Sequence, residues 1–164
     1  MHLAKCLFPL LMVSGLAAQE AAWLGTWKLA TAPDITAAIE KCTEEMSFIK
    51  RPIARSRLKK LNPAYQRVVL SRSGGEFAIQ FEDRQPIRVP ADGKAIAWTR
   101  EDGEKFMVSV KAAPEALAQH YQGEDGARDN RFQMDATGTT LTLEVTVKSQ
   151  KLPKALTYEL IYKR

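Results

Sequence analysis

The sequence is poor in cysteine and histidine, and these shortages exclude several kinds of site. Of 164 residues, two are cysteine, Cys6 and Cys42, and two are histidine, His2 and His120. No phosphate-binding loop, dinucleotide-binding glycine pattern or serine-nucleophile motif is present. A single histidine beyond the first residues, with scattered carboxylates, does not build a metal site. We therefore expect no metal, no cofactor and no enzyme chemistry. An enzyme is the weakest alternative, with His120 as its best candidate base.

Long apolar runs are also lacking, apart from one near the start. Cys6–Leu16 is apolar, follows Lys5 and runs into the small residues Gly15–Ala18. The run is shorter than the ~20 residues of a membrane-spanning helix, and its form is typical of a secretory signal peptide. We predict that residues 1–18 are removed and that the mature protein is periplasmic or secreted. An uncleaved amphipathic anchor is the alternative.

Removal of that leader leaves Cys42 as the one cysteine, so no internal disulfide is expected. Cys42 lies within an apolar stripe, and we interpret it as a buried filler of the core. The net charge of the chain is +5, a mildly basic balance that does not by itself indicate nucleic-acid binding.

Residues 31–62 have the spacing of a helical pair. Apolar side chains recur at three- and four-residue intervals, at Ile35, Ile39, Cys42, Met46 and Ile49. This spacing places them on one helical face, and Asp34 suits the start of the helix. Pro52 is expected to end or kink the first helix, and a second, shorter helix is expected to stop before Pro63.

From about Gln66 onward, short apolar-polar alternations are separated by turn signals that recur about every ten residues. Asp92-Gly93 and Asp102-Gly103 are typical of tight hairpins. Every second residue is apolar in Leu141–Val147 and in Leu156–Tyr162. Such strands have one wet and one buried face, as in an antiparallel sheet. With a first strand over 23–30, we count nine or ten strands.

A meander of this length has two exposed edges unless its first and last strands pair. We therefore predict a mainly β fold, an antiparallel up-and-down β-barrel of about 8–10 strands. A helix–turn–helix cap, residues 31–62, is expected between the first and second strands. The whole barrel domain is expected to span residues 19–164.

The stretch Trp23-Leu24-Gly25-Thr26-Trp27 resembles the first strand of the calycin superfamily, which contains lipocalins and fatty-acid-binding proteins. In those families Gly-x-Trp closes the barrel base, and a basic residue from the last strand packs over the Trp. The resemblance implies structural roles for Gly25 and Trp27, with Lys163 or Arg164 as the cation and Trp23 as part of the base plug. The helical pair is closer to the fatty-acid-binding proteins, and the leader is similar to that of exported bacterial lipocalin-like proteins.

Two features of these families are missing. The Thr-Asp-Tyr motif of lipocalins is absent. Fatty-acid-binding proteins hold a carboxylate with an Arg-x-Tyr pair on the last strand, whereas here Leu156 and Leu160 precede Tyr158 and Tyr162 by two residues. That anion site is therefore not carried over to this chain.

Aromatic side chains dominate the inward positions of the expected barrel. The candidate ligand-binding residues are Phe77, Phe81, Trp98, Phe106, Tyr121, Phe132, Tyr158 and Tyr162. An aromatic cavity with a few hydroxyl groups suits an apolar or amphipathic ligand, such as a lipid or a fatty acid. A barrel filled by its own side chains is the opposite possibility. We predict non-catalytic binding of such a ligand by a monomeric protein.

The segment Lys50–Lys60 carries six cations and no acid. The candidate anion-facing collar near the barrel mouth consists of Lys50, Arg51, Arg55, Arg57, Lys59 and Lys60. Such a collar would meet an anionic headgroup or a membrane surface, and a merely solvated face is the alternative. The alternative function is an envelope-interaction module with a filled barrel that acts through this surface. Nucleic acid is not expected, because no aromatic residues are interleaved with the cations.

Residues 122–130 collect three acids, Glu124, Asp125 and Asp129, without the spacing of a calcium-binding loop. We interpret this stretch as a hairpin turn. His120 and Tyr121 face opposite sides of a strand, so an inward Tyr121 places His120 at the surface.

Overall fold

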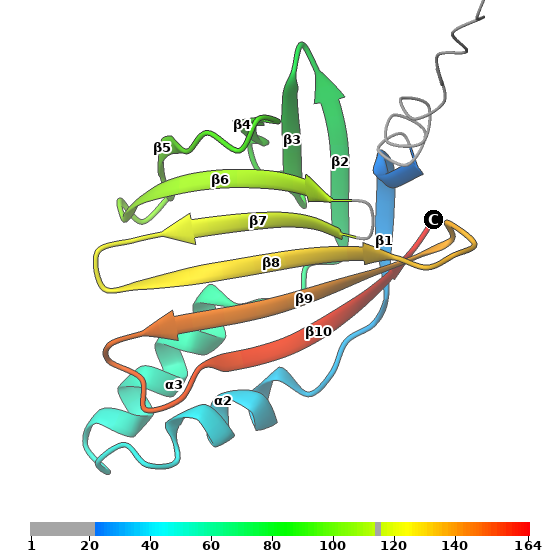
Figure 1. Cartoon of the computed structure of the whole chain (residues 1–164). Coiled ribbons are helices and arrows are strands. Elements are labelled where there is room, and N and C mark those ends of the chain that lie inside the picture. Colours follow the sequence, from blue (N-terminus) through cyan, green and yellow to red (C-terminus); the bar gives the residue numbers. More distant parts are fainter. Residues whose placement is uncertain (1–21, 114–115) are drawn as a thin grey trace, which may run out of the picture.

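The computed structural model describes residues 22–113 and 116–164, which form one antiparallel sheet with two helices inserted after its first strand (Figure 1). The elements are β1 (Gly25–Thr31), α2 (Ile35–Thr43), α3 (Lys50–Leu61), β2 (Arg67–Ser73), β3 (Glu76–Phe81), β4 (Ile87–Pro90), β5 (Ile96–Thr99), β6 (Lys105–Ala113), β7 (Ala116–Gln122), β8 (Gly126–Met134), β9 (Thr140–Ser149) and β10 (Leu156–Lys163). Within these residues, no helix has the length and apolar character needed to span a bilayer. The predicted signal peptide, residues 1–18, lies outside the described residues.

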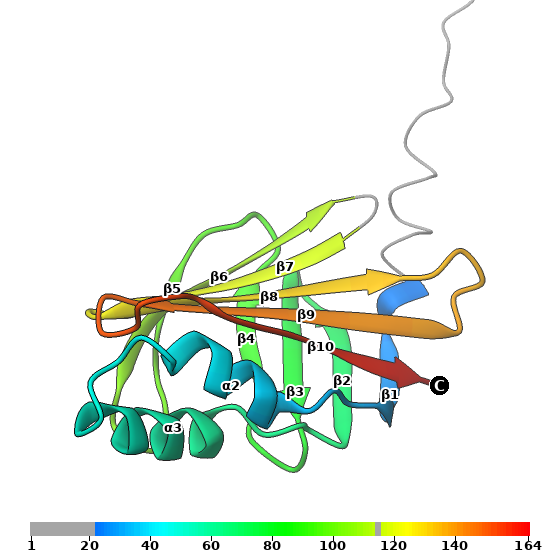
Figure 2. The same cartoon turned by 90° about the horizontal axis from the view of Figure 1, so that it is seen from below.

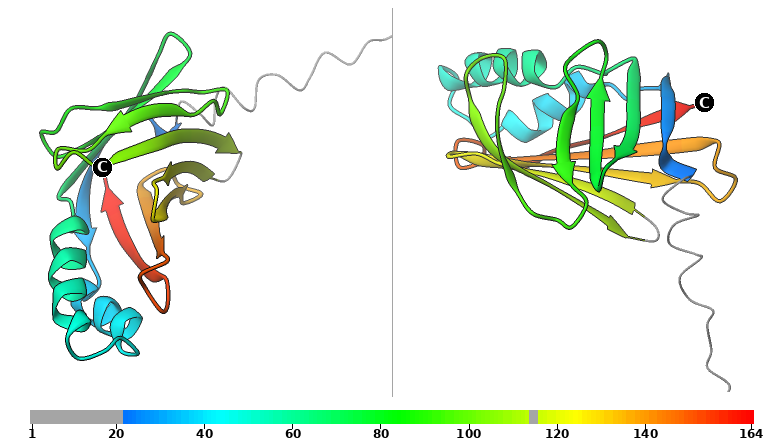
Figure 3. Two further views of the ribbon diagram at one scale, coloured as in Figure 1. Left: turned by 90° about the vertical axis from the view of Figure 1, so that its left-hand side faces the viewer. Right: turned by 90° about the horizontal axis from the view of Figure 1, so that it is seen from above.

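The sheet is nearly closed. Its strand order is β4-β3-β2-β1-β10-β9-β8-β7-β6-β5, so the first strand pairs with the last and the unpaired seam lies between β4 and β5. β2, β3 and β4 cross over β9 and β10 (Figure 3). The predicted up-and-down barrel of 8–10 strands is therefore confirmed, with ten strands in the described part of the chain.

Alternation along each strand explains the closure. In the β9–β10 ladder, Leu143 lies opposite Leu160 and Val145 opposite Tyr158, and all four side chains are buried. Their sequence neighbours point outward, because successive side chains of a strand alternate between the two faces. Rolling the sheet into a barrel brings these apolar faces together, and burial of their area stabilises the fold by ~25 cal/mol per Å².

The Gly-x-Trp motif has the expected position at the start of β1. Gly25 adopts φ +134°, a conformation that side-chain-bearing residues rarely accept. Trp27 is fully buried, and its Nε1 donates to the carbonyl of Trp23 at 3.0 Å. The cation over the indole is Arg164, with its guanidinium 4.5 Å from the ring centroid. Arg164 also donates to the carbonyls of Ala22 and Leu24, so it ties the chain end to the start of β1.

The predicted helical pair is present between β1 and β2 (Figure 2). Asp34 caps α2, accepting from the backbone N–H groups of Thr36 and Ala37, and α2 packs on β10 and α3. The expectation that Pro52 ends the first helix is wrong: α2 already ends at Thr43, and Pro52 lies in the first turn of α3. Proline is tolerated there because the first-turn N–H groups have no partner within the helix.

We expect Trp27→Ala to lower the free energy of unfolding by ~3–5 kcal/mol, because a fully buried indole is replaced by a cavity. Arg164→Ala should cost ~0.5–2 kcal/mol through loss of the cation–π contact. Urea denaturation followed by circular dichroism measures both. The matched control is Lys163→Ala, which removes the exposed neighbouring cation. A loss in the control equal to that of Arg164→Ala would contradict the assignment of Arg164.

Candidate ligand cavity

A cavity of about 980 Å³ occupies one end of the barrel beneath α3. Its walls come from α3, from strands β3 to β9, and from the β7–β8 and β9–β10 connections. The predicted alternatives of a hollow and a filled barrel are therefore both realised, each at a different end. The filled-barrel part of the alternative function does not hold for this end.

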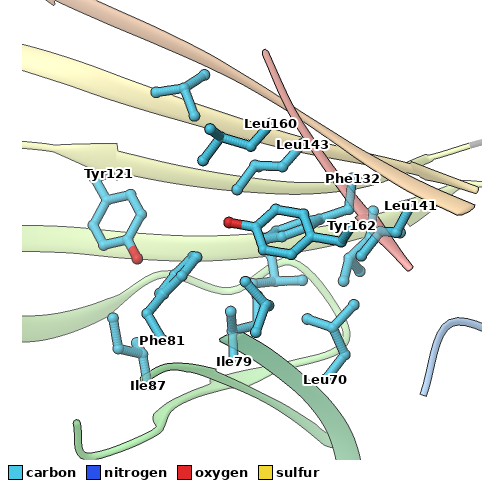
Figure 4. Packing of buried hydrophobic residues seen from close by; sticks show 14 of the residues in the cluster. Leu70, Ile79, Phe81, Ile87, Tyr121, Phe132, Leu141, Leu143, Leu160 and Tyr162 are labelled. Atoms are coloured by element: carbon cyan, nitrogen blue, oxygen red, sulfur yellow. The ribbon is translucent and has the colours of Figure 1, made fainter. Parts of the chain in front are cut away.

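Four of the eight predicted ligand-binding residues line this cavity: Phe81, Trp98, Phe106 and Tyr121. Trp98, Phe106 and Tyr121 form one aromatic group, with ring centroids 5.8 to 6.1 Å apart. Tyr121 and Phe81 extend toward each other from β7 and β3 (Figure 4). These rings give the cavity an apolar wall that suits a hydrocarbon chain.

The other four predicted residues do not line the cavity. Phe77, Phe132 and Tyr162 are buried in the core. Phe132 and Tyr162 lie among Leu70, Leu141, Leu143 and Leu160 (Figure 4). The hydroxyl of Tyr162 donates to the carbonyl of Tyr65 at 3.0 Å, which satisfies its polar atom. Tyr158 is also buried, but its hydroxyl reaches the polar group described next.

Arg128 brings a positive charge into the cavity wall. It stands on β8, is half-buried, and lies on the same strand face as the buried Asn130 and Phe132. Its Nε donates to Asn130 Oδ1 at 2.9 Å and its Nη1 to Asn62 Oδ1 at 2.9 Å. The hydroxyl of Tyr158 lies 3.5 Å from Nη2. All three acceptors are neutral, and within residues 22–113 and 116–164 no carboxylate pairs with Arg128.

Neutral amides continue this polar group into the core. Asn130 Nδ2 donates to Gln119 Oε1 at 3.0 Å, and both residues are 1% exposed. Arginine only donates, so it fixes the oxygen of Asn130 toward itself and the nitrogen toward Gln119. Gln119 Nε2 is left without a partner in the described part of the chain. The chain of amides therefore holds Arg128 in place without neutralising its charge.

Tyr158 is a neutral donor beside this charge. Burial raises the pKa of its hydroxyl above the ordinary value, and the nearby Arg128 only partly opposes that shift. Burial likewise raises the pKa of Tyr121. Both phenols therefore keep their protons at neutral pH, and Tyr158 can donate to an oxygen anion placed against Arg128.

The predicted basic collar is only partly at the cavity mouth, where Lys50 and Arg57 line the cavity. Arg51 instead donates to the carbonyls of Glu44 and Met46, at 2.7 and 2.8 Å. Arg55 donates to Thr43 Oγ1 at 3.0 Å, so it too ties α3 to α2. Lys59 and Lys60 are exposed and away from the cavity lining.

Ion pairs cross the mouth between α3 and the β5–β6 turn. Arg57 Nη2 lies 3.5 Å from Glu104 Oε2, and Arg100 pairs with the same carboxylate and with Asp102. The hydrogen bond from Arg100 lowers the pKa of Asp102 to about 2. Most cations at the mouth therefore already have acidic partners, which distinguishes them from Arg128.

Arg128 is not among the site residues expected from the sequence, because it falls within residues 122–130, the predicted hairpin turn. The turn is shorter: β8 begins at Gly126, and Asp129 pairs with His120 on β7, with Oδ1 and Nδ1 2.6 Å apart. His120 lies outside the cavity lining, as predicted. A signal for Arg128 was present, since it is four residues before Phe132 and therefore on the same face of the strand.

No protein-family profile and no curated protein matches this chain in sequence. Solved structures do match its fold. The REP1-NXSQ fatty acid transporter has a TM-score of 0.57 and 17% identity, over 88% of this chain and 96% of that chain. Fatty-acid-binding protein 1 of Echinococcus granulosus has a TM-score of 0.56 and 13% identity, over 88% and 98%.

A fatty acid binding protein of Schistosoma mansoni, solved in complex with arachidonic acid, has a TM-score of 0.55 and 17% identity, over 89% of this chain and 98% of that chain. Such distant identities establish shape alone. This chain shares the fold of these proteins, a nearly closed antiparallel barrel with a helical pair between its first two strands. The predicted resemblance is confirmed at that level.

The thiol of Cys42 should be unreactive in the folded protein. Its side chain is 2% exposed, and burial raises the pKa of the thiol, so the reactive thiolate is scarce. We expect a thiol reagent such as dithionitrobenzoate to label Cys42 at least ~100-fold more slowly in buffer than in denaturant. Labelling at equal rates in both conditions would contradict the buried position.

Proposed function

We propose that this protein binds a fatty-acid-like ligand inside the barrel, without catalysis, and acts as an exported monomer. The observation that carries the proposal is Arg128, a cation in the cavity wall whose partners are all neutral. A carboxylate is the group that best complements it, because a guanidinium presents paired donors to two oxygens.

Desolvation of Arg128 also favours a carboxylate ligand. A partly buried cation loses hydration, and neutral amide oxygens replace only part of that loss. A ligand carboxylate would supply the missing negative charge, with Tyr158 as a second donor. Its chain would then lie along Phe81, Trp98 and Phe106, where apolar burial contributes ~25 cal/mol per Å².

The solved structures that share the fold support the same ligand class. They include proteins named for fatty acid transport and binding, and one is in complex with arachidonic acid. The anion site proposed here uses β8 and β10, since the Arg-x-Tyr pair is absent from the last strand. The leader over residues 1–18 supports export, so the ligand would be met in the periplasm or outside the cell.

A second candidate function is contact with an anionic membrane surface. Phe48, Ile49 and Ile53 are 81%, 65% and 68% exposed, and they adjoin the cations of α3. Large apolar side chains next to basic residues suit a bilayer that carries negative headgroups, because both contributions act at the same surface. These three residues lie at the start of α3, and Ile53 also lines the cavity, so the two functions are compatible.

Removing the charge of Arg128 tests the ligand proposal. We expect Arg128→Gln to weaken oleate binding roughly 10- to 100-fold, because charge-assisted hydrogen bonds are lost. Binding of oleyl alcohol, which has the same chain and no charge, should stay nearly unchanged. Displacement of a fluorescent fatty-acid probe measures both affinities.

The matched control for this test is Arg131→Gln on the same strand. Arg131 is exposed and pairs with Glu144 at 3.9 Å, so its removal lowers the net charge equally without touching the cavity. If wild-type protein fails to bind oleate, or if both variants bind it equally, the anion-site proposal is wrong.

The membrane proposal predicts that Phe48→Ser and Ile49→Ser together, at two exposed residues outside the cavity lining, reduce binding to phosphatidylglycerol vesicles at least ~10-fold. Vesicle co-sedimentation measures the partitioning, and oleate affinity should be retained. Met107→Ser, at an exposed apolar residue outside the cavity lining, is the control. Undiminished sedimentation of the double variant would refute this contact.

A further inference from the structure

The anion site of the barrel already has an occupant from the chain itself. Asn62 Oδ1 accepts from Arg128 Nη1 at 2.9 Å and lies 3.5 Å from the hydroxyl of Tyr158. These are the two donors against which a ligand carboxylate would bind. Asn62 is 4% exposed and lines the cavity, so its amide oxygen is well placed to stand where a ligand oxygen would go.

We propose that Asn62 is a competing internal occupant of the anion site, which a ligand carboxylate displaces from Arg128. The inference rests on the proposed function, since it concerns the same cavity and ligand class. It adds a residue that sets the affinity and the selectivity of the site: a ligand must bring an acceptor stronger than a neutral amide oxygen. Carboxylates meet that requirement, and uncharged alcohols and esters do not.

The exchange is favourable for an anion because of the difference in charge. A carboxylate adds a Coulombic attraction to the guanidinium that a neutral amide oxygen lacks, and its two oxygens can accept two parallel N–H bonds. Asn130, on the other side of Arg128, is fixed by Gln119 and continues to hold Nε during the exchange. The guanidinium therefore stays in position while only its bond to Asn62 is replaced.

Displacement of Asn62 would also affect the end of α3, because Asn62 is the residue directly after this helix. Its backbone N–H and its Nδ2 both donate to the carbonyl of Leu58, at 3.0 and 2.8 Å. Leu58 is the one buried residue of α3, and the other residues of the helix are half-buried or exposed. The Asn62–Arg128 bond thus ties a weakly packed cover to the barrel wall, and a carboxylate releases that tie.

Two substitutions at this position should act in opposite directions. Asn62→Asp puts a permanent carboxylate beside Arg128, so oleate affinity should fall about tenfold or more. Asn62→Ala removes the competitor, so oleate affinity should rise, by about fivefold. Affinity for oleyl alcohol should change by less than about twofold in both. Ser56→Ala, at an exposed position of α3, is the control variant, and urea denaturation verifies folding.

A second measurement uses the unmodified protein and does not depend on the variants folding. In nitrogen-15 spectra, the side-chain amide resonance of Asn62 should shift when oleate is added and should respond much less to oleyl alcohol. Equal responses to both ligands would overturn the inference, as would oleate affinities in Asn62→Asp and Asn62→Ala that match the wild type. Both substitutions weakening both ligands equally would assign Asn62 to packing alone.

Oleate binding by the Arg128 and Asn62 variants separates an error about Asn62 from an error about the ligand class. If oleate binding requires Arg128 but ignores Asn62, the ligand class stands and the competition is wrong. If oleate does not bind, or binds without Arg128, the proposed function itself fails.

Discussion

Pairing of β1 with β10 is the constraint on which the rest of the molecule depends. Without that ladder, the sheet would separate into two pieces, β4-β3-β2-β1 and β10-β9-β8-β7-β6-β5, because β4 and β5 are not paired with each other. Four strand edges would then be exposed, and the interior would not be enclosed. Trp27 and Arg164 secure the join, since a buried indole on β1 receives the cation that follows β10. Closure leaves a seam between β4 and β5, and the cavity lies at the end of the barrel where these strands, β3 and α3 supply its walls.

The interior is divided between a packed core and a cavity. At one end, fully buried leucines and aromatic rings fill the space between the walls, as in an ordinary core. At the other end, Arg128 and its amide partners take up inward positions. Apolar side chains packed against these polar groups would leave some of their N–H donors without acceptors, at a cost in free energy. This cost is a physical reason for a cavity at this end.

The helical pair serves this hollow end more than it serves the core. α2 is anchored by Ile39 and Cys42, whereas α3 buries Leu58 alone and relies on polar ties. Those ties run to α2 through Arg51 and Arg55, to the β5–β6 turn through Arg57, and to the interior through Asn62. A cover held by hydrogen bonds and ion pairs opens at lower free-energy cost than one held by a packed apolar face, which suits entry of the ligand proposed above.

The sequence by itself determined the strands, the helical insertion, the closure and the place of Trp27, because alternation and turn chemistry are local patterns. It also held a local signal for Arg128, two residues from Asn130 on the face of Phe132. Only the tertiary structure decided which inward residues face a cavity: Phe81 and Tyr121 line it, whereas Phe132 and Tyr162 are packed. It alone joined Asn62 to Arg128 across 66 positions of the chain. Such choices depend on where distant walls meet, and no short-range pattern encodes that distance.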